Sequence, residues 1–449
     1  RLRYRAPRGA LTADLLRELH RHKFALKEFL LKAASCVRPR EPCLAPTARD
    51  LEMPLSFAQQ RLWFIDQLEG NQRVYQVAGA LRIYGRLDVA ALEQGINEII
   101  RRHETLRTTF KTVDGQPVLD IAEQLRVTLP LQDLSTTIAA EREEKALHMA
   151  REVAQRPFDL SRGPLMRFSL LRLEPEEFIL VMAMHHIITD GWSIGILIME
   201  IAALYEAFSR GLPSPLPELP LQYVDFARWQ RLWLSGPVLE DQLSYWRQRL
   251  LGLAPLLELP TDRPRPAVQS YAGTYQVFDL SPELTQRVKA FCLEAEVSPF
   301  IMLLSVFKLL LHRYTSRTDI CVGTPIANRN RAEVEPLIGF FVNTLALRTD
   351  LSGETGFREL VGRVKETALE AYAHQDLPFE MVIDALQPER SLSHSPLFQT
   401  MFVLQNVPAQ PLELPGLRLR ATDVDTRTSL FDLTLVMSEA DESLRGSIE

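Results

Sequence analysis

The segment MAMHHIITDGWSIG at 182–195 holds the side chains best suited to chemistry in this sequence. An apolar stretch ends in His185 and His186, and Asp190 and Gly191 follow after three residues. Neighbouring side chains of a strand face opposite sides, so we expect one histidine to face the interior and the other a cleft. Asp190 and Gly191 are expected to form a turn that brings the carboxylate back to the strand end, with the glycine supplying backbone freedom.

A neutral imidazole at this place could accept a proton from an attacking nucleophile or hydrogen-bond it in position. The chain contains no G-x-S-x-G elbow, no Gly-rich phosphate loop, and no H-E-x-x-H or Cys/His cluster that predicts a metal site. We therefore expect direct transfer, in which the substrate's own nucleophile attacks an activated acyl group. A core histidine pair beside an ordinary Asp-Gly turn is the alternative, and these residues alone leave both interpretations open.

The elements around this segment indicate how it is positioned. A strand at 178–184 forms a predicted hairpin with one at 165–173, and a helix at 193–210 follows and ends at Gly211. The sequence GLPSPLPELP (211–220) is the best internal boundary. Both halves mix strands and helices, which predicts two α+β lobes, at 51–215 and 216–449. Further helices are predicted over 55–68, 90–103, 141–156, 223–234, 239–250, 282–295, 299–315 and 357–373, and strands over 108–111, 117–121, 274–279, 319–325, 398–405 and 430–437.

Composition excludes several classes of protein. The 449 residues are 46% apolar and carry 51 Lys and Arg against 57 Asp and Glu, a net charge of −6. This is the composition of a globular protein of two to three domains, and it argues against a nucleic-acid binder. The charge is uneven, because residues 1–50 hold 12 basic and 5 acidic side chains, which leaves 39 − 52 = −13 for the remainder. A basic leader thus precedes an acidic body.

Cysteine usage and hydropathy predict the compartment. No C-x-x-C spacing is present, so we expect free thiols in a reducing compartment at all four cysteines, Cys36, Cys43, Cys292 and Cys321. The apolar runs at 178–184 and after residue 193 look shorter than the roughly 18 residues that a membrane span needs, and Glu200 interrupts the second. No signal peptide is visible. These features predict a cytoplasmic protein without a membrane partner.

The residues at His185–Gly191, H-H-x-x-x-D-G, resemble the signature of condensation domains from nonribosomal peptide synthetases. The resemblance extends over about residues 50–449, and seven segments in the family's order make coincidence implausible. The six further segments are SFAQQRLWFIDQLEG (Ser56–Gly70), RRHETLRTTF (Arg101–Phe110), YVDFARWQ (Tyr223–Gln230), IGFFVNTLALR (Ile338–Arg348), HQDLPFE (His374–Glu380) and SPLFQTMF (Ser395–Phe402).

This resemblance implies two lobes, each similar to chloramphenicol acetyltransferase, in a V-shaped pseudo-dimer with a tunnel between them. Two phosphopantetheine arms would enter the tunnel from opposite faces. One would bring an acyl or peptidyl thioester from an upstream donor carrier protein, in trans, and the other an aminoacyl thioester from a downstream acceptor carrier that works beside an adenylation domain. Attack of the free amine would form an amide, an acyltransferase reaction. The domain itself would bind no cofactor, because the arms belong to the carriers.

The resemblance also implies roles for single residues. His186 would be the catalytic residue, either as a general base or as a group that orients the amine and stabilises the charged intermediate. His185 and Asp190 would support the active site, Asp190 through an ion pair with an arginine from the other half. Arg329 is the best positional match for that arginine, and Arg331 is the second.

Gly191 belongs to the same supporting group, because it would let the backbone lie close to the substrate. Trp192 and Ser193 are expected to line the tunnel. Asn343 lies in an apolar stretch where a buried amide needs partners, so a tunnel role and a structural role both stay open for it.

The remaining polar residues of the matched segments have structural interpretations. Arg61, Arg107 and Glu104 are expected to be ion-pair partners within one lobe. The other histidines in or directly beside matched segments lack the H-x-x-x-D context and are expected to be structural, namely His103, His374 and His394.

The subtype can also be read from the resemblance. AQQRLWFIDQLEG and HHIITDGWS are most similar to domains that join an L-configured donor to an L-amino acid. Two alternatives stay open, a catalytically silent condensation-like domain that recruits partners and an ester-forming or epimerising relative. The intact histidine pair argues against the silent domain.

The two ends of the chain complete these expectations. Residues 1–35 resemble part of the N-terminal docking domain of tubulysin-type hybrid polyketide–peptide synthetases, and their charge suits the acidic C-terminal tail of an upstream synthase. A helical leader packed on the lobe is the alternative. Residues 36–50 contain three prolines and are predicted to be a linker. The family normally continues beyond LRGSIE, so we expect the second lobe to be truncated at its end.

Overall fold

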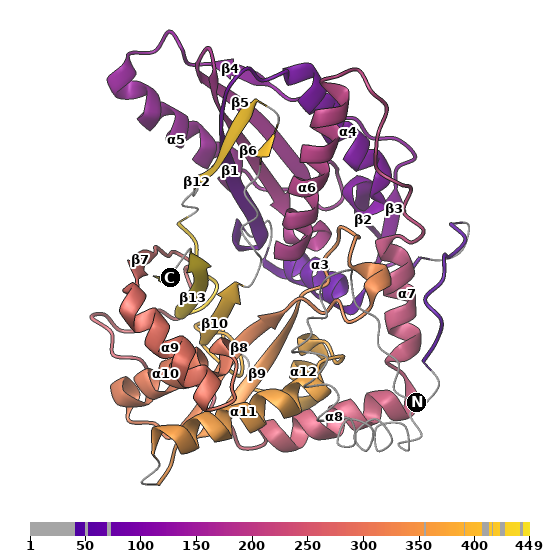
Figure 1. Cartoon of the computed structure of the whole chain (residues 1–449). Helices are drawn as coiled ribbons and strands as arrows, with labels where there is room; N and C mark the ends of the chain where they lie inside the picture. The colour runs from indigo at the N-terminus through magenta and orange to yellow at the C-terminus, as the bar shows by residue number, and fades with distance from the viewer. Residues whose placement is uncertain are drawn as a thin grey trace, which may run out of the picture.

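The computed structural model describes residues 41–49, 53–69, 73–353, 356–389, 391–405, 413–414, 416–422, 427–440 and 443–449. The predicted docking region at 1–35 therefore lies outside the described residues. The described chain forms two lobes, each built on a six-stranded sheet, with a two-stranded sheet in addition. Figure 1 shows the N-terminal lobe above the C-terminal lobe.

The N-terminal lobe contains a sheet in the order β11-β12-β1-β6-β5-β4. Its strands are β1 (Gln76–Tyr84), β4 (Leu131–Asp133), β5 (Met166–Glu174), β6 (Glu177–His185), β11 (Glu413–Leu414) and β12 (Leu417–Thr422). Its helices are α3 (Phe57–Glu69), α4 (Val89–Arg102), α5 (Ala139–Gln155) and α6 (Gly191–Phe208). The predicted strands at 108–111 and 117–121 form a small hairpin, β2 (Thr108–Val113) and β3 (Gln116–Ile121). Its two turn residues both have positive φ, as a tight hairpin turn requires, and they are Asp114 and Gly115.

Both faces of β6 are buried, which explains its continuous apolar sequence. Leu180 and Met182 belong to the core that also contains buried residues of α4 and α6. Ile179 and Val181 point to the other face, where they pack with Ala146 of α5. This strand therefore crosses the middle of the lobe and delivers the histidine pair at its end.

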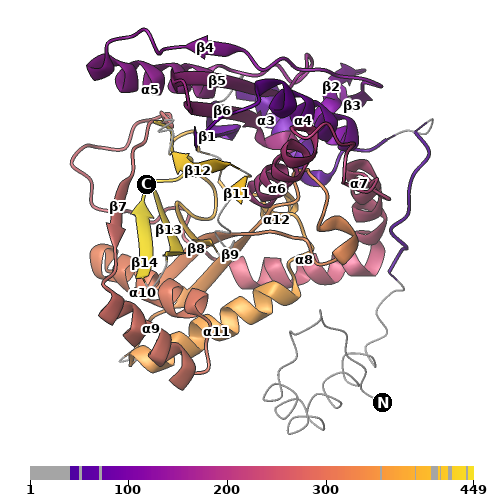
Figure 2. The same ribbon diagram turned by 45° about the horizontal axis from the view of Figure 1, so that its top comes forward.

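The C-terminal lobe contains a sheet in the order β7-β14-β13-β10-β8-β9. Its strands are β7 (Gln276–Asp279), β8 (Asp319–Ile326), β9 (Asn343–Asp350), β10 (Thr400–Gln405), β13 (Leu433–Ala440) and β14 (Ser443–Ile448). The helices of this half are α7 (Tyr223–Trp233), α8 (Gly236–Leu250), α9 (Pro282–Glu294), α10 (Pro299–Thr315), α11 (Phe357–Ala373) and α12 (Phe379–Leu386). Figure 2 shows α9, α10 and α11 on the side of this sheet that faces away from the N-terminal lobe.

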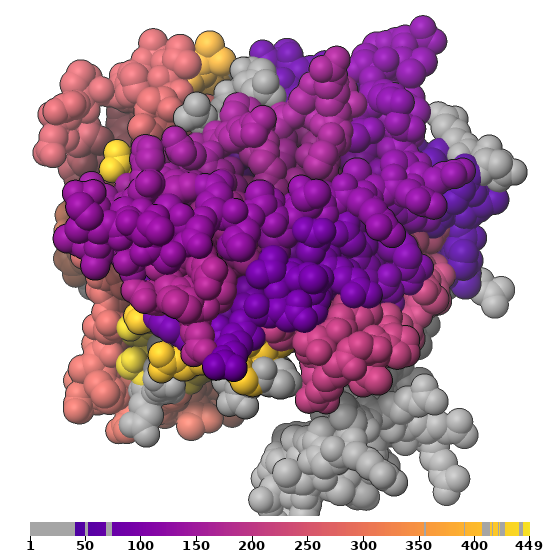
Figure 3. Space-filling model, turned by 90° about the horizontal axis from the view of Figure 1, so that it is seen from above, coloured from indigo at the N-terminus to yellow at the C-terminus, as the bar shows by residue number. Residues whose placement is uncertain are grey.

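The chain returns to the first lobe near its end. Strand β12 pairs antiparallel with β1, with Leu419 opposite Ile83. In Figure 3, seen from above, atoms in indigo and magenta cover the centre of the face and yellow atoms appear at its edge. The predicted division into 51–215 and 216–449 takes no account of this return, because a strand pairing so distant in sequence leaves no local pattern.

Part of the predicted linker is packed against the protein. Leu44 is buried beside Phe226 in a small apolar cluster. The indole nitrogen of Trp229 donates to the carbonyl oxygen of Pro42 at 3.0 Å, and Arg49 forms an ion pair with Asp225 at 2.8 Å. Residues 41–49 thus form a fixed strap and not a free connection.

Helix α6 differs from its prediction in one respect. It has 18 residues and is apolar enough to cross a membrane by length and composition, and α9 with α10 meets the same test only as one bent span. The expectation that the run after residue 193 is too short was therefore wrong. The reason lies in the fold, because one face of α6 contributes Leu197 and Leu204 to the core and the other lines a cavity.

Candidate active site

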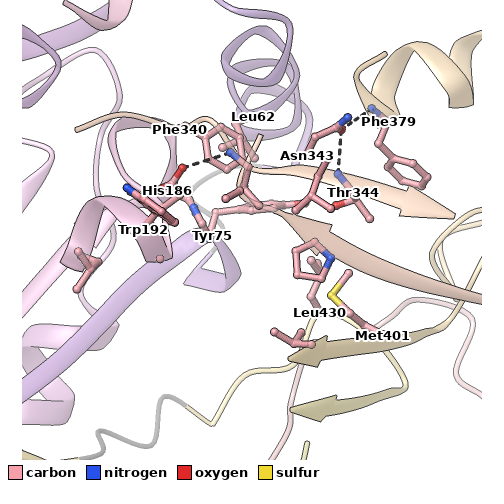
Figure 4. A pocket seen from close by; sticks show the side chains of 18 of the residues that line it. Leu62, Tyr75, His186, Trp192, Phe340, Asn343, Thr344, Phe379, Met401 and Leu430 are labelled. Carbon is pink, nitrogen blue, oxygen red and sulfur yellow. Dashed lines mark hydrogen bonds between the residues drawn. The ribbon is translucent and has the colours of Figure 1, made fainter. Parts of the chain in front are cut away.

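His186 follows directly after β6, in the 3-10 turn η3 (His186–Ile188). Its Nδ1 atom lies 2.9 Å from the backbone carbonyl oxygen of Thr189. A carbonyl group only accepts hydrogen bonds, so Nδ1 carries the proton of the neutral ring and Nε2 keeps its lone pair. Because His186 lines the cavity between the lobes, Nε2 is the nitrogen left for a substrate (Figure 4).

The surroundings of His186 favour its neutral form. Burial lowers the pKa of His186 below the usual 6.5, although the hydrogen bond to Thr189 and the charge of Asp190 act in the opposite direction. The ring of Phe340 lies 5.1 Å from the imidazole, measured between centroids. The imidazole is therefore unprotonated at neutral pH and able to take up a proton.

His185 occupies a different environment. It is 4% exposed, and its Nδ1 accepts a hydrogen bond from the backbone nitrogen of Ile187 at 3.1 Å. The ring makes an edge contact with Phe158, with centroids 6.4 Å apart. Burial, with a smaller contribution from the charge of His186, lowers the pKa of His185 to about 3. His185 thus caps the turn from inside the lobe.

Asp190 joins the two lobes. It is the N-cap of α6, where Oδ1 accepts from the backbone nitrogen of Ser193 at 2.8 Å. Its Oδ2 accepts from the backbone nitrogens of Phe341 and Val342 at 2.9 and 3.2 Å. The carboxylate therefore holds the start of α6 against the segment that leads into β9 of the other lobe.

Arg329 completes this buried junction. Its Nη2 lies 3.4 Å from Oδ1 of Asp190 and 2.8 Å from Oγ of Ser193. Its Nη1 donates to the carbonyl oxygens of Val334 and Leu337 at 2.6 and 2.7 Å. One guanidinium group thus holds the loop at 334–337 in place and also faces the carboxylate at the start of α6.

Arg331, the second candidate for this ion pair, lies elsewhere. It forms ion pairs with Glu41 and Glu333, and its guanidinium lies 5.2 Å from the ring centroid of Trp229. It therefore ties the strap at 41–49 to the second lobe and does not contact Asp190.

A cavity of about 2360 Å³ lies between the lobes and contains His186 in its wall. In Figure 4, His186, Trp192 and Tyr75 come from the first lobe, whereas Met401 of β10 and Leu430, which precedes β13, come from the second. Most of the wall is apolar. Within the described ranges, no group of three or more His, Cys, Asp or Glu side chains could hold a metal ion.

A family model described as a condensation domain matches residues 50–449. The chain belongs to the condensation domain family. It is 50% identical over 422 residues to a linear gramicidin synthase protein of Brevibacillus parabrevis, and the match covers 94% of this chain and 5% of that protein. It is 43% identical over 429 residues to phosphinothricin tripeptide synthetase PhsC of Streptomyces viridochromogenes, covering 95% and 39%. This condensation domain thus spans a small part of these relatives.

Solved structures agree with the two-lobed fold. The X-domain from teicoplanin biosynthesis matches with a TM-score of 0.82 at 30% identity, over 91% of each chain. The first condensation domain of the CDA synthetase shares the fold with a TM-score of 0.73 at 22% identity, over 89% of this chain and 92% of that one. The predicted α+β fold, with two chloramphenicol acetyltransferase-like lobes, is confirmed. Condensation domains of nonribosomal peptide synthetases form peptide bonds, an acyltransferase-type reaction, so the predicted class of function is confirmed as well.

Gly191 of the condensation domain has an ordinary helical backbone and open space beside it. It is the first residue of α6, its φ is outside the left-handed region, and an added Cβ would meet no atom within 4 Å. The predicted need for backbone freedom was therefore wrong. The open space belongs to the cavity, so the glycine keeps the wall clear beside His186.

Trp192 and Ser193 do not share one role. Trp192 lines the cavity, is 43% exposed, and donates from its indole nitrogen to the carbonyl oxygen of Glu335 at 3.2 Å. Ser193 is fully buried and does not line the cavity, so its prediction as a tunnel residue was wrong. Its Oγ donates to the carbonyl oxygen of Gly339 at 2.8 Å and accepts from the nitrogen of the same residue at 3.1 Å. As the third helical residue after the Asp190 cap, it points back into the junction.

Asn343 both lines the cavity and holds its wall together. Its amide nitrogen donates to the carbonyl oxygens of Gln375 and Leu377 at 2.9 and 2.8 Å. Its amide oxygen accepts from the nitrogens of Thr344 and Phe379 at 2.8 and 3.0 Å (Figure 4). All its hydrogen-bonding capacity is thus used to fix the turn before α12, which accounts for a buried amide at this place.

The arginine of the segment Ser56–Gly70 forms an ion pair with a residue of the second lobe. Arg61 on α3 forms an ion pair with Glu380 on α12 at 2.9 Å, and its guanidinium lies 5.6 Å from the ring centroid of Phe379. The expectation of a partner within one lobe was wrong for Arg61, because Glu380 is 319 residues away in the sequence and belongs to the second lobe. Arg107 and Glu104 do approach each other within the first lobe, at 3.8 Å.

The other histidines lie in three different places. His103 is buried and its Nε2 lies 3.1 Å from Glu200. His374 stacks on Tyr245 with centroids 3.8 Å apart. His394 lines the cavity, a position that its sequence context did not indicate.

Sequence reasoning missed several residues around His186. Thr189 acts through its carbonyl oxygen, which every residue possesses, so its side chain gives no signal. Phe340 lies within a matched segment but looks like any apolar core residue. Tyr75 and Met401 come from elements far apart in the chain, and only the fold brings them to one cavity.

Proposed function

We propose that His186 is the catalytic residue of this condensation domain and acts through Nε2 as a general base. The hydrogen bond from Nδ1 to the carbonyl oxygen of Thr189 carries this assignment, because it leaves Nε2 as the unprotonated nitrogen in the cavity wall. The acceptor amine attacks the thioester carbonyl carbon, the C–N bond forms, and the amine proton passes to Nε2. The C–S bond then breaks, and the proton passes to the leaving sulfur.

Burial supports this role. A lowered pKa keeps His186 neutral at pH 7, whereas an imidazolium could not accept a proton. The α-amine of an aminoacyl thioester has an ordinary pKa near 8, so part of it is neutral already and positioning supplies much of the rate. His186 therefore serves as a base of moderate strength beside two tethered reactants.

Asp190 and Arg329 act in this proposal as positioning residues. Their junction sets the distance between the turn at His186–Thr189 and the segment at 337–342 from the second lobe. Loss of either charge would leave the other buried without compensation. His185 supports the same turn from below, and Gly191 keeps the adjoining wall open.

The partners belong to the same proposal. The donor carrier arrives from upstream, in trans, with an L-configured acyl or peptidyl thioester, and the acceptor carrier arrives from the downstream module with its adenylation domain. Each carrier's phosphopantetheine arm enters the cavity. The basic region at 1–35 docks the acidic C-terminal tail of the upstream synthase, and the assembly line is cytoplasmic.

A transfer assay tests the function. The domain is mixed with a donor-loaded carrier and an aminoacyl-loaded acceptor carrier, and intact-protein mass spectrometry follows the acceptor. We expect the acceptor to gain the acyl mass. Hydroxylamine cleaves the thioester to the acceptor carrier, and the released product should keep the acyl group if the new bond is an amide and lose it if the new bond is an ester. If the carriers bind but no acyl group is transferred, the proposed enzymatic function is refuted and the catalytically silent recruitment domain is favoured.

A further inference from the structure

His103 is a buried histidine that contacts both lobes. It follows α4 of the first lobe and is 1% exposed. Its Nε2 atom lies 3.1 Å from a carboxylate oxygen of Glu200 on α6, and its Nδ1 atom lies 3.3 Å from the backbone nitrogen of Ile338. Ile338 belongs to the segment of the second lobe that leads into β9, so one imidazole ring links α6 to the opposite lobe.

The two contacts assign the proton of this ring. Although burial alone would raise the pKa of Glu200, hydrogen bonds from His103 and Arg102 lower it below its usual value, so the group is an ionised carboxylate. A carboxylate only accepts hydrogen bonds, so Nε2 of His103 donates and carries the proton. A backbone N–H only donates, so Nδ1 of His103 accepts from Ile338 through its lone pair. One tautomer of the neutral ring satisfies both partners.

We use the name crossing segment for residues 338–342, which pass along the first lobe before β9. The nitrogen of Gly339 donates to Oγ of Ser193 at 3.1 Å, and two nitrogens further along donate to Asp190 at 2.9 and 3.2 Å. These contacts all belong to the start of α6. His103 is the separate anchor at the beginning of the crossing segment, because it accepts from the nitrogen of its first residue.

Phe340 lies in the middle of the crossing segment and packs against His186. The two ring centroids are 5.1 Å apart, and Figure 4 shows the side chains beside each other. Burial lowers the pKa of His186, so a ring that shields the imidazole from water favours its neutral form. The place of Phe340 depends on the backbone on either side of it, which His103 and Asp190 hold.

The crossing segment has little room to move without losing contacts. Ile338 is 1% exposed, so its N–H is out of reach of solvent and needs an acceptor from the protein. A Cβ added at Gly339 would lie 2.0 Å from Cδ2 of Tyr223, so the chain passes directly against this ring. A buried donor that loses its acceptor is costly, and we expect the segment to shift in order to recover one.

We propose that His103 is a positioning residue for the transfer reaction, whose Nδ1 acceptor holds the crossing segment so that Phe340 stays against the imidazole of His186. This inference rests on the proposed function of His186. Glu200 contributes by binding the Nε2 proton, which keeps the lone pair on Nδ1. His103 does not line the cavity, so it acts through the crossing segment and not on a substrate.

Two substitutions separate the two halves of the ring. His103→Asn places an amide oxygen near the position of Nδ1 and keeps an acceptor for Ile338, whereas His103→Gln places an amide nitrogen near Nε2 and keeps a donor for Glu200. We expect His103→Asn to stay close to the wild type. His103→Gln should lose about tenfold or more in kcat, with KM for both loaded carriers unchanged, because displacement near the reacting groups lowers the rate and not the binding.

The pH profile separates positioning from a loss of stability. With a carrier-bound hydrazide acceptor, whose nitrogen stays unprotonated over the range, the acid limb of kcat/KM reports the ionisation of His186. In His103→Gln its midpoint should move up towards 6.5, because Phe340 no longer shields the imidazole. The titratable groups that act on His186 are His185 and Asp190, and both are unchanged in every variant. Circular dichroism at each pH checks that the variants are folded.

Arg102→Gln is the control for lost stability. Arg102 is also buried and pairs with Glu200, but it donates to the carbonyl oxygen of Pro217 and not to the crossing segment. This variant should lower the melting temperature and keep the midpoint of the wild type. A shift of the midpoint as large as that of His103→Gln would count against the role of Nδ1.

Three further results would overturn the positioning role. They are equal rates for His103→Asn and His103→Gln, a loss of about tenfold in a folded His103→Asn domain, and a slow His103→Gln domain with the wild-type midpoint. A wild-type rate in a folded His186→Ala domain would refute the proposed function and this inference with it. A rate that depends on His186 but not on the choice of Asn or Gln at position 103 would refute the inference alone.

Discussion

The carboxylate of Asp190 accepts a hydrogen bond at 2.9 Å from the backbone nitrogen of Phe341, which belongs to the segment of the second lobe that leads into β9. The same side chain caps α6 through Ser193 and faces Arg329. One residue of the histidine motif therefore connects the turn at His186–Thr189, the helix behind it and the opposite lobe.

Asp190→Ala should lower the free energy of unfolding by about 3–5 kcal/mol, because it leaves Arg329 buried without its counter-charge and removes the acceptor for several buried N–H groups. Denaturant unfolding measures this. Asp88→Ala is the control, since Asp88 caps α4 through Ala91 and is exposed. It should cost only about 1 kcal/mol. Equal losses for the two variants would show that the contacts across the lobes contribute nothing.

Local patterns in the sequence predicted much of the scaffold. Strand β6, helix α6 and the hairpin at Asp114-Gly115 follow from apolar runs, helical spacing and turn residues, which are all properties of neighbouring residues. Strand β1 was missed because Gly79 and a weak alternation make it look irregular, although it lies in the middle of its sheet. Pairing with β6 and β12 defines this strand, and pairing cannot be read locally.

His185 makes stability depend on pH. Its pKa is about 3 in the folded domain because of burial, against 6.5 when exposed. Above pH 6.5 both states are neutral, whereas below it only the unfolded state takes up the proton. Stability therefore falls from pH 6.5 towards pH 3, by about 2 kcal/mol at pH 5 from this group.

The variant His185→Asn isolates this contribution, because asparagine can accept from Ile187 without titrating. The unfolding free energy is measured at pH 7 and pH 5 for both proteins. The decrease between the two pH values should be smaller in the variant than in the wild type by about 2 kcal/mol. An unchanged pH dependence would mean that His185 titrates normally in the folded domain.

The ion pair between Arg61 and Glu380 should couple α3 to α12. A double-mutant cycle with Arg61→Gln and Glu380→Gln is expected to give an interaction energy of about 0.2–1 kcal/mol that decreases with salt. The exposed pair Arg86–Glu176, at 2.8 Å within the first lobe, is the control and should give less. A coupling for Arg61 and Glu380 no larger than that of the control would refute this coupling of α3 to α12.

The candidate site shows which residues a motif can reveal. His186, Asp190 and Arg329 were singled out by resemblance, and the structure brings them together. Ser193 was assigned to the wrong surface, because sequence does not tell which side of α6 meets the second lobe. Arg61 and Glu380 are separated by 319 residues, so no spacing could relate them.

The pH dependence of transfer should report the lowered pKa of His186. With a carrier-bound hydrazide acceptor, whose nitrogen stays unprotonated over the range, kcat/KM should fall on the acid side with a midpoint below 6.5. Burial favours the neutral ring, so the base remains active at lower pH than an exposed histidine would. A midpoint at or above 6.5 would contradict the assignment of this base.

The most direct measurement is the single-turnover rate of amide formation by His186→Ala with both carriers loaded. His148→Ala, at an exposed histidine on α5, is the control. We predict a fall of about 100-fold or more for His186→Ala, with melting temperature and carrier binding unchanged, because the proton acceptor is lost. A rate equal to that of the wild type in a folded, carrier-binding His186→Ala domain would contradict the account.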